Sequence, residues 1–198
     1  MFKRLSYRGM TLIEILTALA IISIMALLAM PSFQGWIANS KVRSVAETVQ
    51  NGLRSAQNEA LKRSHQTAFV LTNATPAANA TAAANGTNWY AQVLPMYTGE
   101  TVAAPVMSSS GSFGKIVQGV TVTGPAQICF NSMGRLVTNT TATFAGVTTG
   151  CVAPTSMTTY DLTTTNADHP LEVQAMPNGQ IRICDKTRTL SATTPDGC

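Results

Sequence analysis

A single carboxylate, Glu14, interrupts an apolar run near the start of the chain. From Met10 to Met30 every other side chain is apolar or carries only a hydroxyl group. A charge without a partner in an apolar environment is costly, and a carboxylate in such a place usually serves a function. If the chain is cut after Gly9, Met10 gains an α-amine, and Glu14 can pair with the amine of a neighbouring copy. Such a pair would fix the axial register between the two copies.

The apolar run has the length of a membrane-spanning helix. A helix from Met10 to Met30 is about 30 Å long, which matches the hydrocarbon core of a bilayer. Three basic residues precede it: Lys3, Arg4 and Arg8. The positive-inside rule therefore predicts that residues 1–9 are cytoplasmic and that the rest is exported. The run is too long for a secretory signal peptide, whereas a plain single-pass anchor is a competing interpretation.

We expect a transmembrane helix over residues 10–35, with a break or kink at Pro31. Proline removes a backbone donor and clashes with the preceding turn of a helix. Residues 36–63 continue with a helical period, and their apolar positions form one stripe: Val42, Val45, Ala46, Val49, Leu53, Ala56 and Ala60. Such a stripe predicts an amphipathic helix that packs on a core.

The remainder of the chain has the pattern of short strands separated by polar loops. Strands are predicted at residues 66–71, 89–94, 116–122, 127–130, 159–162, 171–176 and 180–184. Loops are predicted at residues 72–88, 98–114 and 138–157. Asn178-Gly179 is a strong signal for a hairpin turn. The expected fold class is α+β, with a long N-terminal helix packed on an antiparallel β-sheet head that has disulfide-tied loops.

Four cysteines lie in the exported part of the chain: Cys129, Cys151, Cys184 and Cys198. No CxxC pair occurs and the two histidines are far apart, so we expect no metal site and no cofactor. An even number of cysteines in an oxidising compartment predicts two disulfides. Three pairings are possible, and the pairs Cys129–Cys151 and Cys184–Cys198 are favoured because each closes a short loop, worth about 3 kcal/mol.

Composition argues against an enzyme or a general polyanion-binding protein. Charged residues make up 11% of the chain, and no nucleophile motif or phosphate-binding loop is present. We therefore expect no catalytic residues and no small-molecule substrate. The formal charge of +4 includes three basic residues among the first nine. The rest of the chain has 10 basic and 9 acidic residues and is nearly neutral. No global field attracts nucleic acid, so function should come from assembly.

The N-terminal residues Gly9-Met10-Thr11-Leu12-Ile13-Glu14, together with Pro31 and the basic leader, resemble the class III signal of type IV pilins and type II secretion pseudopilins. The family usually has Phe at the position of Met10. The resemblance implies that prepilin peptidase removes residues 1–9 by cutting after Gly9 and that Met10 is N-methylated. It also implies that Glu14 registers subunits and that the helix melts locally at Pro31 inside a filament.

Residues 46–63 resemble the GspH/FimT/FimU branch of this family, with Gln57 in place of its usual arginine. A GspH-like head is expected over residues 46–184, followed by a disulfide-tied tail, 185–198. Some members of the branch bind DNA through a Gly-Arg-x-Arg motif, and the first arginine is missing from Gly179-Gln180-Ile181-Arg182. The possible DNA contacts are Arg182, Lys186 and Arg188. Solvated charges on an edge strand are the favoured interpretation of these three residues.

The resemblance predicts a minor pilin of the FimU/FimT type that takes part in initiation of type IV pili. Its expected partners are other minor and major pilins, prepilin peptidase and the inner-membrane assembly platform. It would lie in the inner membrane with a periplasmic head and later in the pilus, and would support twitching motility. The alternatives are a GspH-type minor pseudopilin of type II secretion and a DNA-binding minor pilin.

Overall fold

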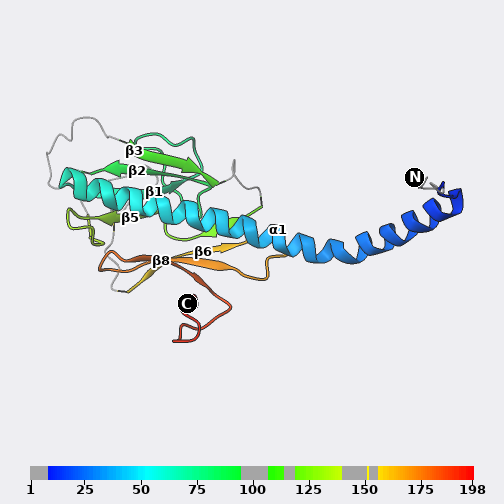
Figure 1. Cartoon of the computed structure of the whole chain (residues 1–198). Helices are drawn as coiled ribbons and strands as arrows, with labels where there is room; N and C mark the ends of the chain where they lie inside the picture. The colour runs from blue at the N-terminus through cyan, green and yellow to red at the C-terminus, as the bar shows by residue number, and fades with distance from the viewer. Residues whose placement is uncertain (1–8, 95–106, 114–118, 140–150, 152–155) are drawn as a thin grey trace, which may run out of the picture.

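The computed structural model describes residues 9–94, 107–113, 119–139, 151 and 156–198. A single long helix, α1 (Leu12–Arg63), runs along a β-rich head with its C-terminal half, and its N-terminal half projects away from the head (Figure 1). Within the head, α1 and two antiparallel sheets contribute to one hydrophobic core. The expected α+β class is confirmed.

Helix α1 has defined ends. The Thr11 side chain accepts a hydrogen bond from the Glu14 backbone N–H, as an N-cap does. At the other end Ser64 is left-handed (φ 53°), and its backbone N–H reaches the carbonyl oxygens of Ala60 and Leu61. Helical structure is continuous through Pro31.

Among the described residues, no single straight helix is long and apolar enough to span a membrane. The segments Leu12–Leu27 and Ser32–Arg63 together meet the requirement, with a bend of 44° between them. Local melting of the helix at Pro31 stays a prediction.

The predicted apolar stripe of α1 is confirmed. All seven of its residues are buried and belong to the main core. The core also contains aromatic side chains from both sheets: Phe69, Trp89, Phe130 and Tyr160. The Phe69 ring stacks on Trp89 and meets Tyr160 edge-on, so Phe69 joins the two sheets beneath the helix.

The first sheet has the strand order β3-β2-β1-β5. Its strands are β1 (Thr67–Thr72), β2 (Asn88–Val93), β3 (Met107–Ser112) and β5 (Gln127–Phe130). The central strand β1 is buried at every position, because α1 covers one face of the sheet. A second apolar cluster, which includes Val70, Tyr90 and the Cys129–Cys151 pair, covers the other face.

The second sheet has the strand order β4-β6-β7-β8. Its strands are β4 (Thr121–Thr123), β6 (Thr158–Thr163), β7 (Leu171–Ala175) and β8 (Ile181–Asp185). The β7–β8 hairpin pairs Ala175 with Ile181, so its turn contains Asn178 and Gly179 as predicted. Strand β8 lies at the edge of the sheet.

Two sequence predictions are wrong in detail. Residues 98–114 were expected to be a loop, but Met107–Ser112 forms β3 and pairs with β2. At Gly111 the neighbouring strand leaves no room for a side chain, because a Cβ there would lie 2.4 Å from Nε1 of Trp89. In addition, residues 119 and 120 of the strand expected at 116–122 are not part of a strand, which begins at Thr121; residues 116–118 lie outside the described residues. Most of the expected 138–157 loop lies outside the described residues.

The loop at residues 72–88 is held by asparagines that recur every six residues. The Asn73 side-chain oxygen accepts from the backbone N–H of Thr87, and that of Asn85 accepts from the N–H of Gly124. Between them, Asn79 and Gln92 exchange two hydrogen bonds. The sequence predicted a loop here, and these contacts hold it against the head.

Candidate functional site

The N-terminal half of α1 exposes apolar side chains along its length within the described residues. Fifteen of the 19 exposed large hydrophobic side chains of the described residues lie between Met10 and Ile37. Two hydroxyls in this segment donate within the helix: Thr17 to the Glu14 carbonyl at 3.0 Å, and Ser23 to the Leu19 carbonyl at 2.8 Å. Glu14 is exposed, and its carboxylate makes no ion pair within the described part of the chain. It is the one charge of this segment.

The predicted cleavage position lies at the start of the described residues. Gly9 and Met10 precede the helix and are exposed, Met10 to 70%. Among the described residues, apart from the chain neighbours of Gly9, no atom lies within 4 Å of a Cβ built there. The rest of the predicted leader, residues 1–8, lies outside the described residues.

The head is fastened to α1 at the end nearest the apolar segment. The Asn39 side-chain oxygen accepts hydrogen bonds from the backbone N–H groups of Asp168 and His169, at 3.0 and 3.1 Å. His169 in turn contacts the Asp185 carboxylate through Nδ1 at 2.9 Å. Burial by itself would raise the pKa of Asp185, but hydrogen bonds from Thr187 and His169 outweigh burial and hold the pKa below its usual value.

A groove between α1 and β8 carries charges of both signs. Its walls include Arg43 and Glu47 from α1, and Arg188 and Asp196 from the tail. Arg43 Nε lies 3.0 Å from Glu47, and Arg188 Nη1 lies 2.7 Å from Asp196. Each of these four charges has an ionic partner in the same wall, and the Asp185 carboxylate also lines the groove, so the groove has no excess of positive charge.

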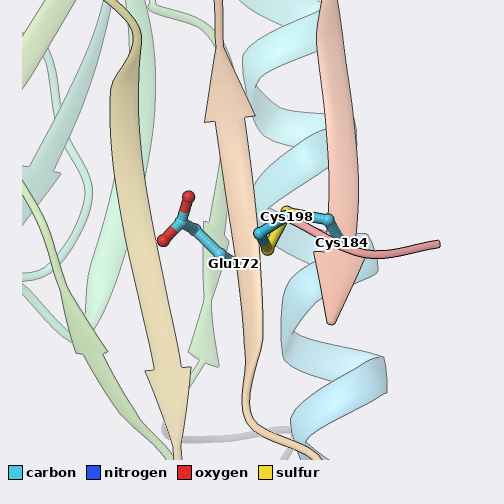
Figure 2. A group of neighbouring side chains, drawn as sticks. All are labelled: Glu172, Cys184 and Cys198. Atoms are coloured by element: carbon cyan, nitrogen blue, oxygen red, sulfur yellow. A yellow bond between two sulfur atoms is a disulfide. The ribbon is translucent and has the colours of Figure 1, made fainter. Parts of the chain in front are cut away.

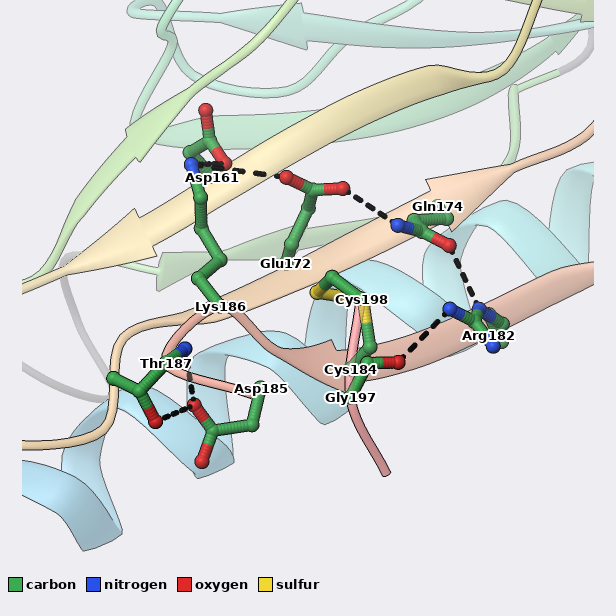
Figure 3. Close-up of a disulfide and its surroundings, with 10 residues drawn as sticks. All are labelled: Asp161, Glu172, Gln174, Arg182, Cys184, Asp185, Lys186, Thr187, Gly197 and Cys198. Atoms are coloured by element: carbon green, nitrogen blue, oxygen red, sulfur yellow. Dashed lines mark hydrogen bonds and ion pairs between the residues drawn. A yellow bond between two sulfur atoms is a disulfide. The ribbon is translucent and has the colours of Figure 1, made fainter. Parts of the chain in front are cut away.

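Each of the three candidate DNA contacts is bound to other groups of the chain. Arg182 donates to the Gln174 side chain and to the Gly197 carbonyl, at 2.7 and 3.0 Å (Figure 3). Lys186 binds the Asp161 carboxylate at 2.6 Å, and this hydrogen bond raises the pKa of the Lys186 ammonium. With Arg188 paired to Asp196, all three cations are used to hold strands and tail together.

The structure joins Cys129 to Cys151 and Cys184 to Cys198, the pairing that loop length favoured. The second disulfide ties the last residue of the chain to β8, and the tail also pairs with that strand between Asp185 and Gly197. Glu172 lies beside this disulfide (Figure 2), with potential ligand atoms of all three residues within 4.8 Å. Because both sulfurs are bonded to each other, the group offers no thiolate to a metal.

Two regions of the sequence match known families. Residues 4–30 match the prokaryotic N-terminal methylation motif, and residues 45–167 match the family described as type II transport protein GspH. The second match covers more than half of the chain. This chain belongs to the GspH family. The membership expected from the sequence, in the GspH-like branch of pilins and pseudopilins, is confirmed.

Solved structures of a type IV minor pilin resemble this GspH-family chain. One crystal form of FimU from Pseudomonas aeruginosa strain PAO1 aligns with a TM-score of 0.48 and 16% identity, over 73% of this chain and 88% of FimU. A second crystal form of FimU aligns with a TM-score of 0.45 and 16% identity, over 71% of this chain and 90% of FimU. No curated protein matches the sequence. Family membership points to a structural protein that assembles with other pilins rather than to an enzyme.

The residues that brace the GspH-family head were not found from the sequence. Gln57 was noted only as a replacement for arginine, yet its side-chain amide reaches two distant turns, at Gly134 and Gly179. Asn39 was not singled out at all. Both side chains bind backbone groups, and no local pattern marks a side chain whose partner is a remote backbone atom.

Proposed function

We propose that this GspH-family protein is a minor pilin that takes part in initiating or assembling type IV pili. The observation that carries the proposal is the division of α1 into two halves. One half is packed into the head, whereas the other exposes most of the large apolar side chains that are exposed in the described residues, together with a single carboxylate, Glu14. Such a surface needs a lipid or protein environment, and a filament of packed helices supplies one after the membrane has been left.

The maturation steps of the proposal involve the first residues of the chain. Prepilin peptidase cuts after Gly9, and Met10 becomes the N-methylated terminus. Residues 10–35 then serve as the inner-membrane anchor with the head in the periplasm. The proposal is supported by the match of residues 4–30 to the methylation motif. Mass spectrometry of the N-terminal peptide from the membrane fraction tests cleavage and methylation together.

The second candidate function is that of a minor pseudopilin in type II secretion. The description of the matching family favours it, while the two disulfides of the head favour the pilus. Both machines use the same anchor and the same registry carboxylate. The choice between them therefore has to come from the phenotype of a deletion strain.

The deciding experiment deletes the gene in a strain that cannot retract pili. We expect surface pili to be lost and to return when the gene is restored, with twitching restored in a retracting strain. Secretion of a type II substrate is measured in the same deletion. Normal pili together with lost secretion would contradict the pilus role and favour the pseudopilin.

DNA uptake through the C-terminal cations is not favoured. Arg182, Lys186 and Arg188 all have partners within the chain, so phosphate binding would first require breaking these contacts. A gel-shift with the purified protein at low salt tests this directly. A shift that disappears in the Arg182→Ala, Arg188→Ala double variant would restore the DNA-binding candidate.

A further inference from the structure

We propose that one face of α1, formed by Phe33, Trp36 and Ile37, binds the phospholipid headgroup region on the periplasmic side of the bilayer. We call it the aromatic face. Because the head packs on the opposite side of α1, this contact would orient the head away from the lipid that the aromatic face touches. The inference rests on the proposed membrane anchor and adds an interaction surface with a defined orientation.

The aromatic face is exposed where the helix already carries the head on its other side. Phe33 is 61% exposed and Trp36 66%, and the two rings lie 5.7 Å apart. On the opposite side of the helix, Ala38 is 6% exposed, and about one turn further along Val42 is fully buried in the head. The helix at this level therefore has a head-facing side and an unpartnered aromatic side.

The depth of the aromatic face follows from helix length. A helix needs about 20 residues to cross the hydrocarbon core. Counted from Met10, the core ends near Met30, so Phe33 and Trp36 fall within the next two turns. That position is the interfacial layer, where aromatic side chains are enriched because one end is apolar and the other can meet water.

Polarity changes along the helix as it does across a membrane surface. Above Ile37, the side of the helix away from the head carries Ser40 and Ser44, and Lys41 is exposed nearby. Lys41 has no ionic partner in the described part of the chain. Its ammonium lies one turn beyond Ile37, where lipid phosphates are found, and anionic headgroups attract such a cation. Apolar, hydroxyl and cationic residues thus follow one another outward.

The two tryptophans of the chain make the inference testable. Trp36 is exposed on the aromatic face, whereas Trp89 is 7% exposed in the head core. The full chain is reconstituted into phosphatidylcholine–phosphatidylglycerol vesicles whose lipids carry bromine at a shallow or a deep acyl position. Trp89→Phe leaves only Trp36 as the emitter. Trp36→Phe leaves only Trp89 and is the matched control.

We expect Trp36 emission to be lost most strongly with shallow bromines and Trp89 emission to be unaffected. If Trp89→Phe does not fold, subtracting the Trp36→Phe emission from that of the unaltered chain yields the same quantity. A chain that floats with vesicles but whose Trp36 is not quenched, or is quenched most by deep bromines, overturns the inference alone. A chain that does not float with the vesicles overturns the anchor as well.

Discussion

Gln57 on α1 donates a hydrogen bond from Nε2 to the carbonyl oxygen of Gly179, which lies 122 positions later in the chain, at 2.7 Å. The same nitrogen donates to the carbonyl of Gly134 at 2.8 Å. Gly134 lies in the turn that follows β5 of the first sheet, and Gly179 lies in the β7–β8 turn of the second. One amide therefore ties the helix to both sheets at the end of the head remote from the exposed apolar segment.

Replacing Gln57 with Leu should destabilise the head. The substitution keeps the volume but leaves two carbonyl oxygens without their donor, which costs roughly 1–3 kcal/mol. Urea unfolding of the purified chain in detergent measures the change. Gln50→Leu is the control, because Gln50 is also half-buried on α1 but makes no side-chain hydrogen bond in the described residues; its cost should stay within about 0.5 kcal/mol. Equal losses in both variants would contradict the bracing role.

Replacing Gly179 with Ala should be more harmful than replacing Gly119. Both glycines have φ near +90°, so both variants carry the backbone cost of a left-handed alanine, about 1–2 kcal/mol. Only at Gly179 would the new Cβ also collide with a carbonyl, the Gly134 oxygen at 2.1 Å, whereas at Gly119 the nearest atom is 3.7 Å away. The difference in the free energy of unfolding between the Gly179→Ala and Gly119→Ala variants therefore measures the cost of the clash with the Gly134 turn. Variants of equal stability would mean that the turns separate without cost.

Acid should destabilise the tail through Asp185. Its pKa is held below the usual value in the folded chain, so the unfolded chain binds the proton more readily. The ionised Asp185 carboxylate therefore stabilises the folded chain at pH values above about 4, the pKa of an ordinary carboxyl group. This stabilisation is lost as the pH falls through the pKa that Asp185 has in the folded chain. We expect Asp185→Asn to flatten the pH dependence of urea unfolding below about pH 4. Asp168→Asn, which changes an exposed carboxylate in the adjacent loop, should retain the wild-type profile.

The sequence predicted the elements whose residues repeat with a clear period. The stripe from Val42 to Ala60 repeats as a helix does, and every member is buried. Strand β5 and the Asn178-Gly179 turn were also found, because apolar strand residues and a two-residue turn signal are local features. Strand β3 was missed because its sequence, Met-Ser-Ser-Ser-Gly-Ser, has neither alternation nor β-branched residues. Strand β3 pairs with β2, and its Gly111 lies against the Trp89 ring, where a larger residue would not fit.

The division into two sheets and the braces between them lie beyond local patterns. Phe69 and Tyr160 meet across the sheets although they are far apart in the sequence, and nothing near either residue indicates the other. The same holds for Asn39 and the backbone of Asp168. By contrast, the chemistry of the apolar segment is local, so Glu14 and Gly9 stood out in the sequence before any fold was known.

Replacing Glu14 with Ala should block incorporation into filaments while sparing earlier steps. We expect cleavage after Gly9 and membrane insertion to proceed without the carboxylate. Within the filament, the amine of a neighbouring subunit would lose its partner in an apolar core, a loss of roughly 3–5 kcal/mol that should lower incorporation by at least about tenfold. The measurement is an immunoblot of sheared filaments against the membrane fraction. Thr17→Ala, which removes a hydroxyl bonded only within its own helix, should be incorporated normally. Wild-type amounts of the Glu14 variant in filaments would show that the carboxylate does not set the register.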